Sequence, residues 1–255
     1  MTNYRQWHED VQGFKKFNSE CQVYFCQCDK YHRLSLFELL RIFTDAAVED
    51  FNQRCMSYDT LTDSDVGILL SKQAFRFHKM PVGNQKITVR TWEEKPEALT
   101  FARTYEIYDT ESGELLVSGD SRWLLVDLSK RRLMPLKMFT MRVPPENTTE
   151  HDCLKADKIS IPKNLSPLCK RPIWYSDIDG NGHMNNARYG AFVIDCLPEE
   201  YQKKEFSDFR INYNKEAVQG EMIELFGSFN DSEKKITIIG KQNENNCFEA
   251  ELFWK

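Results

Sequence analysis

Three polar side chains of this sequence, Asp179, Asn181 and His183, alternate with Gly180 and Gly182. In an extended segment, residues two apart point to the same side, so we expect these three side chains to face one ligand. The glycines would let that ligand approach the backbone closely. A carboxylate, an amide and an imidazole on one side can position a water molecule and remove its proton. Residues 179–183 are therefore the first candidate for a catalytic site.

A helix predicted over residues 186–197 follows this segment directly, because apolar side chains recur at helical spacing until a proline ends the pattern. The first amides of a helix have no acceptor within it and lie at the positive end of its dipole. Such a position suits a carbonyl oxygen that becomes negative during a reaction.

Two other interpretations of the polar segment stay open. Residues 177–182 match the first six positions of a calcium-binding EF-hand loop, but the twelfth position is Arg188, a cation where the ion needs a carboxylate. A segment rich in Asp, Asn and Gly is also typical of a turn that only caps a helix. We expect capping from Asn185 and Asn186, whereas for residues 179–183 both capping and catalysis stay open.

A repeat in the chain points to Glu216. Residues 79–83 (Lys-Met-Pro-Val-Gly) and 215–220 (Lys-Glu-Ala-Val-Gln-Gly) each end a strand-like run, and they lie 136 positions apart. This alignment places Glu216 opposite Met80. An acid near a strand end is usually a solvated surface residue. If Met80 points at apolar surroundings, however, Glu216 occupies the equivalent interior place, where a carboxylate favours a functional role. Only one copy keeps reactive groups, so we expect one active half and one helper half.

Hydrophobic periodicity predicts the same order of elements in both halves, a strand, an apolar helix and four strands. In the first half these are residues 21–28, 35–55, 66–79, 85–94, 99–109 and 115–127, with a capping box at Ser35 and Glu38. In the second half they are residues 172–176, 186–197, 206–214, 221–229, 234–241 and 247–254. Short turns between the strands predict antiparallel pairing. Prolines break the periodicity over residues 140–170, which indicates a linker.

We therefore predict an α+β fold in which a long antiparallel sheet wraps around one apolar helix, twice in one chain. This is a tandem hotdog, with residues 1–142 as the first unit, 143–170 as the linker and 171–255 as the second unit. Two separate α+β domains with a different wrap are the alternative. Because a tandem arrangement supplies the usual pairing of hotdog units within one chain, we expect a monomer or a homodimer.

Composition argues against several classes of protein. The 255 residues carry a net charge of -5, which disfavours a general nucleic-acid binder. No apolar run approaches the length of a membrane-spanning helix. The polar start lacks the apolar core of a secretory signal, so we expect a cytoplasmic protein. The eight cysteines include no CxxC pair, which predicts reduced thiols and no structural metal site. We expect neither a metal nor a cofactor.

The polar segment and the residues after it resemble the acyl-ACP thioesterases, which release fatty acids from acyl carrier protein. The signature of that family is Asp-x-Asn-x-His followed by Asn-Asn, a Tyr and an apolar helix. Residues 179–189 (Asp-Gly-Asn-Gly-His-Met-Asn-Asn-Ala-Arg-Tyr) follow this signature. The family then shows an aromatic, basic strand ending in Glu-Cys, and residues 208–217 here end in Glu216 and Ala217. The resemblance covers the whole chain and is more specific in its second half.

This resemblance implies thioester hydrolysis, with a catalytic set of Asp179, Asn181, His183 and Glu216 and substrate contacts from Asn185, Asn186 and Tyr189. One of the two carboxylates would act as a general base on water or as a nucleophile. Plant members carry a Cys after the Glu, proposed as a nucleophile, whereas Ala217 cannot attack. Plant members also carry a plastid transit peptide, and none is visible here, which predicts a bacterial member. The resemblance also implies that the first half sets the preferred acyl-chain length.

The partner implied is acyl carrier protein bearing a fatty acyl chain. Carrier protein is strongly acidic and so is this chain, which means that binding needs a local basic patch. One candidate patch comprises residues 130–132 with Lys137 and Arg142, and another comprises residues 170–171 with Arg188. A hotdog thioesterase acting on acyl-CoA is the alternative enzyme. A nonenzymatic acyl-binding hotdog is the alternative from another class, and it would need no positioned acid and histidine.

Overall fold

The computed structural model of this protein describes residues 5–255. Its strands are β1 (Gln6–Val11), β2 (Phe14–Gln22), β3 (Val66–Phe77), β4 (Lys86–Glu97), β5 (Thr100–Asp109), β6 (Leu115–Asp127), β7 (Arg132–Leu133), β8 (Ser166–Pro172), β9 (Phe206–Tyr213), β10 (Met222–Asn230), β11 (Lys235–Gln242) and β12 (Asn245–Trp254). Its helices are α1 (Leu36–Gln53), α2 (Tyr58–Asp63), α3 (Asn186–Asp195) and α4 (Glu199–Gln202), with short 3-10 helices η1 (Phe25–Gln27), η2 (Leu136–Met138) and η3 (Tyr175–Asp177).

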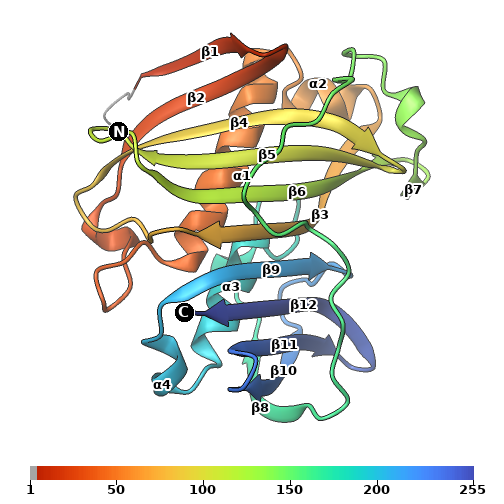
Figure 1. Cartoon of the computed structure of the whole chain (residues 1–255). Coiled ribbons are helices and arrows are strands. Elements are labelled where there is room, and N and C mark those ends of the chain that lie inside the picture. Colours follow the sequence, from red (N-terminus) through yellow and green to blue (C-terminus); the bar gives the residue numbers. More distant parts are fainter. Residues whose placement is uncertain (1–4) are drawn as a thin grey trace.

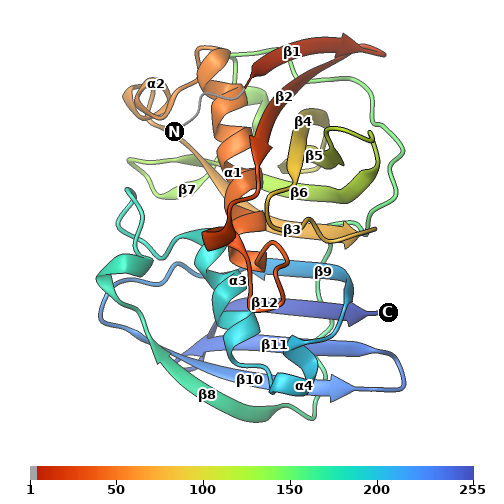
Figure 2. The same cartoon turned by 90° about the vertical axis from the view of Figure 1, so that its left-hand side faces the viewer.

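The strands form one continuous antiparallel sheet in the order β1-β2-β4-β5-β6-β3-β9-β12-β11-β10-β8, and β7 pairs with β6 (Figure 1). The two main helices, α1 and α3, lie on the same face of this sheet (Figure 2). One hydrophobic core contains residues of both helices and of strands from both halves. The predicted tandem hotdog is therefore confirmed, and the chain does not form two separate domains.

The start of α1 agrees only partly with its predicted capping box. Ser35 Oγ accepts a hydrogen bond from the Glu38 N–H at 3.3 Å, as predicted. The return bond from Glu38 to Ser35 is wrong: the Glu38 carboxylate accepts from Gln27 and Arg41 instead, while the Ser35 N–H donates to the Gln27 carbonyl. The box fails because η1 brings a backbone acceptor to Ser35 before Glu38 can reach it.

The two halves meet where β3 pairs with β9, and this junction is twofold symmetric. The pairs Lys72–Asn212 and Arg76–Asp208 both exist. Moving one member of either pair forward by 136 positions, and the other back by 136, produces the other pair. The 136-residue repeat read from the sequence is therefore confirmed as a symmetry of the fold.

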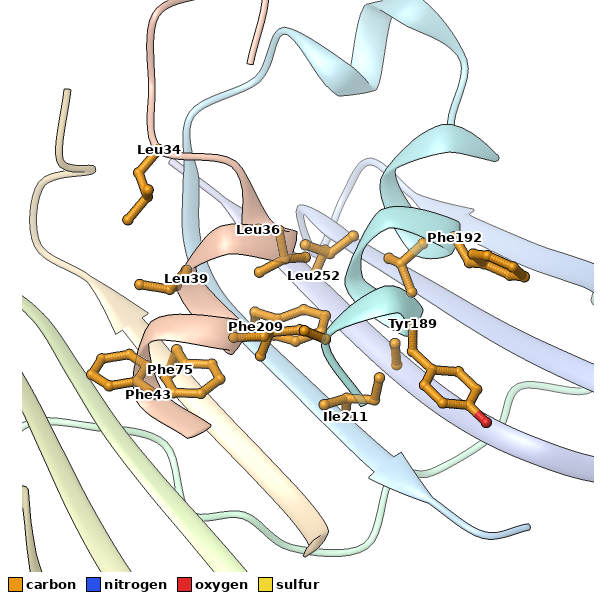
Figure 3. Packing of buried hydrophobic residues seen from close by; sticks show 14 of the residues in the cluster. Leu34, Leu36, Leu39, Phe43, Phe75, Tyr189, Phe192, Phe209, Ile211 and Leu252 are labelled. Atoms are coloured by element: carbon orange, nitrogen blue, oxygen red, sulfur yellow. The ribbon is translucent and has the colours of Figure 1, made fainter. Parts of the chain in front are cut away.

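Aromatic rings fill the core across this junction. Phe75 and Phe209 are directly opposite on β3 and β9, and their parallel rings have centroids 6.4 Å apart. Phe43 of α1 stacks on Phe75 with centroids 5.0 Å apart (Figure 3). Where the two helices meet, a Cβ at Gly190 would come within 2.7 Å of Leu40, so the close contact between α1 and α3 needs glycine there.

The predicted strands 66–79 to 115–127 and 206–214 to 247–254 agree with β3–β6 and β9–β12 to within three residues at each end. The first strand of each half is displaced. Residues 21–28 were expected to be a strand, but β2 ends at Gln22, and β1 was not predicted. Residues 172–176 were also expected to be a strand, but β8 ends at Pro172 and η3 follows it.

The expected linker ends earlier than predicted, because its last residues belong to β8. Two prolines within β8 suggested irregular structure, yet β8 is an edge strand that pairs only with β10, and an edge strand tolerates proline. The preceding segment crosses the sheet on the face opposite the helices (Figures 1 and 2). Ala156 fixes it there, since the Ala156 N–H donates to Asp120 at 2.8 Å. We propose residues 143–165 as the linker between the two units.

Candidate active site

The polar segment at residues 179–183 forms a tight turn, so the predicted extended conformation is wrong. The Asp179 N–H donates to the His183 carbonyl at 2.9 Å, and the Gly182 N–H donates back to the Asp179 carbonyl at 3.0 Å. The Asp179 carboxylate accepts the Asn181 N–H at 2.9 Å. Gly182 has a φ of 78°, a left-handed conformation that favours glycine. An Asp side chain that caps its own turn competes successfully with the extended form.

Buried Asp177 and the start of α3 hold this turn in place. The Asp177 carboxylate accepts the Trp174 N–H at 3.0 Å and lies 3.5 Å from Arg188 Nε. The Asp177 carbonyl accepts the Asn185 N–H at 2.9 Å. Asn185 Oδ1 accepts the Ala187 N–H at 2.9 Å, so its predicted capping role is confirmed. Because Arg188 faces the first acid of the calcium-like sequence, this loop presents a cation where an EF-hand would hold its ion.

A cavity of about 300 Å³ opens beside this turn. Four polar residues of the second half line one end of it: Asp179, Asn181, Asn185 and Asn186. Most of the remaining wall comes from α1, α2, β3 and β5 of the first half and is largely apolar. The structure therefore joins predicted reactive groups of one half to an elongated apolar space in the other. Sequence reasoning did not identify the lining residues, because the core and the cavity draw on the same residue types.

His183 and Glu216 come together next to this cavity but do not line it. His183 Nε2 lies 3.2 Å from Glu216 Oε2, and their side chains are 33% and 48% exposed. Met80 packs partly buried against the core, as expected, but the inference that Glu216 is equally interior is wrong. Ala217 takes the buried position instead, and its carbonyl accepts the Met184 N–H at 2.7 Å.

Tyr189 lies in the core on α3 and is not among the residues that line the cavity. Its ring makes edge contacts with Tyr213 and Phe248 at centroid distances of 5.5 and 5.0 Å. Burial raises the pKa of the Tyr189 hydroxyl. Packing of α3 onto the sheet accounts for its position, and a substrate contact from Tyr189 stays a prediction.

The first half contains the backbone of the same turn with different side chains. The Asp29 N–H donates to the Arg33 carbonyl at 2.7 Å, as the Asp179 N–H does to His183. Arg33 therefore stands where His183 stands, and it is engaged structurally: its guanidinium contacts Asp29 and donates to the carbonyls of Gln202 and Lys204. The sequence did not reveal this counterpart, because its residue types have changed while its backbone has not.

The second half also lacks the space that forms the acyl-sized cavity in the first. Helix α1 extends to Gln53, whereas the shorter α3 ends at Asp195 and is followed by α4. Tyr201 of α4 packs on Phe229 and Trp254, with centroid distances of 4.7 and 5.6 Å. This asymmetry explains why one half presents the polar groups and the other presents the cavity.

Comparison with known proteins places this architecture in a family. The profile of the acyl-ACP thioesterase N-terminal domain matches residues 14–139, and that of the C-terminal domain matches residues 168–254. The chain belongs to the acyl-ACP thioesterase family. The family signature and its alanine after the Glu thus stand in a member of the family rather than in a chance match.

Individual members of the family are similar only at low identity. Oleoyl-acyl carrier protein thioesterase 2, chloroplastic, of Arabidopsis thaliana is 22% identical over 188 residues, which are 69% of this chain and 50% of that protein. The chain therefore spans about half the length of the plant thioesterase. An acyl-ACP thioesterase from Bacteroides thetaiotaomicron superposes with a TM-score of 0.83 at 23% identity, covering 94% of this chain and 98% of that one. The 12:0-ACP thioesterase from Umbellularia californica gives 0.78 at 15% identity, covering 94% and 97%. These structures share the fold.

No helix among residues 5–255 is long and apolar enough to cross a membrane. The bacterial origin and cytoplasmic location expected from the sequence stay predictions.

Proposed function

We propose that this chain hydrolyses the thioester of fatty acyl-acyl carrier protein and releases the free fatty acid. One observation carries the proposal: an apolar cavity from one half ends at Asp179 and Asn181 from the other. An acyl chain in that cavity would bring its thioester to the polar end. Membership of the acyl-ACP thioesterase family supports the same activity.

In the proposed mechanism, the Asp179 carboxylate removes a proton from water because, of the two candidate acids, only Asp179 lines the cavity. The water oxygen attacks the thioester carbonyl carbon. Asn186 is the first residue of α3, so its N–H has no acceptor within the helix and would stabilise the oxyanion. The carbon–sulfur bond then breaks, and Asp179 returns the proton to the leaving thiolate.

Glu216 acts through His183 in this proposal. The two side chains are 3.2 Å apart and stand beside the turn that carries Asp179. A carboxylate that accepts a hydrogen bond from an imidazole fixes the ring orientation. We therefore assign His183 to positioning the thioester or the water, and Glu216 to positioning His183.

A cysteine nucleophile is not part of this mechanism. Ala217 occupies the position where plant members carry the Cys. The buried Cys247 lies near in the fold, since its carbonyl accepts the Lys215 N–H. Burial raises the pKa of the Cys247 thiol, and a thiol with a raised pKa is a poor nucleophile.

Release of free thiol from matched substrates tests the function. We expect kcat/KM for acyl-acyl carrier protein to exceed that for acyl-CoA with the same chain, because only the former offers a protein surface to bind. The release is followed with a thiol reagent at equal substrate concentrations. Faster hydrolysis of acyl-CoA would support the alternative thioesterase, and binding without hydrolysis would support the nonenzymatic alternative.

The structure favours one of the two basic patches as the carrier site. Arg131, Arg132 and Lys137 are exposed around the β6–β7 hairpin, close in sequence to Leu128, which lines the cavity. Arg142 does not belong to this surface, because its side chain is only 7% exposed and pairs with Glu93.

The charges of the other candidate patch already have acidic partners: Lys170 contacts Glu224, Arg171 contacts Asp195 and Arg188 contacts Asp177. We therefore expect Arg131→Glu with Arg132→Glu to raise KM for the carrier-bound substrate by about tenfold, since rim charges steer an acidic partner. KM for a small acyl thioester should not change. An unchanged KM for the carrier-bound substrate would exclude this patch.

A further inference from the structure

One part of the cavity wall consists of charged side chains, although most of the wall is apolar. Glu93 and Arg103 line the cavity and are only 5% and 3% exposed. They are cross-strand partners on β4 and β5. The rim is different, since lining residues such as Val48, Tyr58 and Leu69 are exposed. The charged wall is therefore at the deep side of the cavity.

The charges of this wall are paired with one another rather than directed at a ligand. One oxygen of Glu93 lies 2.8 Å from Arg54, and the other contacts Arg142. Arg103 donates to Asp50 at 2.8 Å. Because both Glu93 oxygens already have arginine partners, a polar group on a ligand would have to break an ion pair to bind there. The wall is thus suited to stopping a chain and not to recognising its end.

Aromatic rings connect this ionic wall to the apolar part of the cavity. Phe51 and Phe101 line the cavity. The guanidinium of Arg103 lies 5.0 Å from the centroid of the Phe51 ring, and that of Arg142 lies 4.6 Å from the centroid of Phe101. A ring held by a cation on its far face resists displacement. The end of an acyl chain would therefore meet a rigid surface.

The length of the lining indicates which chains reach this surface. Along α1 the lining residues run from Thr44 to Asn52, which is about 12 Å at 1.5 Å per residue. An extended chain advances about 1.2 Å per bond, since the three backbone bonds of one residue span about 3.5 Å. The lining therefore accommodates about ten carbon–carbon bonds.

We infer that the ionic wall, formed by Glu93 and Arg103 with their partners Asp50, Arg54 and Arg142, sets the longest acyl chain that this protein accepts, at about ten to twelve carbons. This inference rests on the proposed thioesterase function. Up to that limit, each buried methylene should raise kcat/KM about fourfold. A longer chain must displace a paired buried charge, which costs more than another methylene gains.

The native protein tests the limit with saturated acyl thioesters of one carrier, from hexanoyl to hexadecanoyl. We expect kcat/KM to rise to decanoyl or dodecanoyl and to fall by about tenfold or more at tetradecanoyl. A rise that continues to hexadecanoyl would overturn the ionic stop and leave the thioesterase function standing. Absence of hydrolysis at every length would overturn the proposed function and this inference with it.

A double variant tests the wall itself. Glu93→Ala with Arg142→Leu removes one charge of each sign, and Arg54 keeps Asp50 as a partner at 3.2 Å. We expect kcat/KM for tetradecanoyl, relative to decanoyl, to increase about tenfold over the native ratio. Arg210→Leu with Glu251→Ala is the matched control, because it removes a buried ion pair between β9 and β12 whose residues do not line the cavity.

Thermal unfolding of both double variants verifies that each is folded before its profile is compared. A native ratio in a folded Glu93→Ala/Arg142→Leu protein would overturn the inference, and so would an equal shift in the control. If the cavity variant does not fold, the chain-length profile of the native protein decides alone.

Discussion

Replacing Asp179 by Asn should lower kcat for acyl-thioester hydrolysis by about 10²- to 10⁴-fold, the range for loss of a positioned general base. The Asp179 side chain lines the polar end of the cavity and accepts the Asn181 N–H at 2.9 Å. Asparagine has nearly the same shape and keeps an oxygen to accept that bond, but it cannot take a proton from water. Steady-state kinetics should therefore show a large fall in kcat with little change in KM.

The chain itself offers a matched control in Asp29→Asn. Asp29 occupies the equivalent turn of the first half, where its carboxylate accepts the Tyr31 N–H at 2.9 Å. It is far from the polar end of the cavity in function, since its partner Arg33 is used for structure. We expect this variant to keep kcat near the native value. Equal losses in the two variants, or full activity in Asp179→Asn, would contradict the catalytic assignment.

A double-mutant cycle separates the role of Glu216 from that of Asp179. If Glu216 acts only by orienting His183, then adding Glu216→Gln to His183→Ala should cause no further loss of kcat. Adding Glu216→Gln to Asp179→Asn should cause a further loss instead. Additive losses in the His183 background would show that Glu216 itself acts on the substrate or on water.

The pairing of Glu216 with His183 could be predicted because the two halves repeat their backbone. The Met184 N–H donates to Ala217 in the second half, just as the Leu34 N–H donates to Pro81 in the first, both at 2.7 Å. A backbone repeat of this kind leaves a trace in local sequence patterns of strands, turns and helix starts. Alignment of the copies therefore brought residue 216 next to the polar turn without any knowledge of the sheet.

The conformation of the turn and the use of its charges could not be predicted in the same way. The alternation of glycines is compatible with an extended segment, and only the bond from the Asn181 N–H to Asp179 selects the turn. Arg142 sits in a polar, irregular stretch that is typical of an exposed surface. It is buried because Glu93 lies 49 positions away in sequence but in contact in space. Such tertiary pairs leave no periodic signal.

The cavity depends on a difference between the halves that sequence patterns describe only in outline. Both helices were predicted, but the longer α1 and the filling of the second half by Tyr201 determine where space is left. Periodicity shows which residues are apolar and does not show which of them contact a void. The ionic wall is hidden for the same reason, since Asp50 and Arg103 each look like an ordinary surface charge when taken alone.

The second large effect is expected on stability and concerns Asp50. This carboxylate is completely buried on α1 and contacts Arg103, Arg54 and His8 at 2.8, 3.2 and 3.0 Å. Removing the charge from a buried pair leaves its partners uncompensated and typically costs about 3–5 kcal/mol. Asp50→Asn should therefore lower the free energy of unfolding by about that amount, and the Tm by about 10 °C. Denaturant unfolding at neutral pH gives the first value and a thermal melt gives the second.

Acid pH gives this prediction a signature that a packing defect would not show. Burial alone would raise the pKa of Asp50, but Arg103 and Arg54 outweigh it and hold the pKa below its usual value. A depressed folded-state pKa contributes stability above the ordinary pKa of the unfolded chain, and that contribution is lost as the pH falls through the folded-state pKa. The stability difference between native protein and Asp50→Asn should thus be constant from neutral pH to about pH 4 and shrink below it. Asp45→Asn, on the same helix but exposed and paired only with Arg41, should cost about 0.5 kcal/mol or less. A difference that does not shrink in acid would show that the buried charge of Asp50 is not what stabilises this end of the cavity.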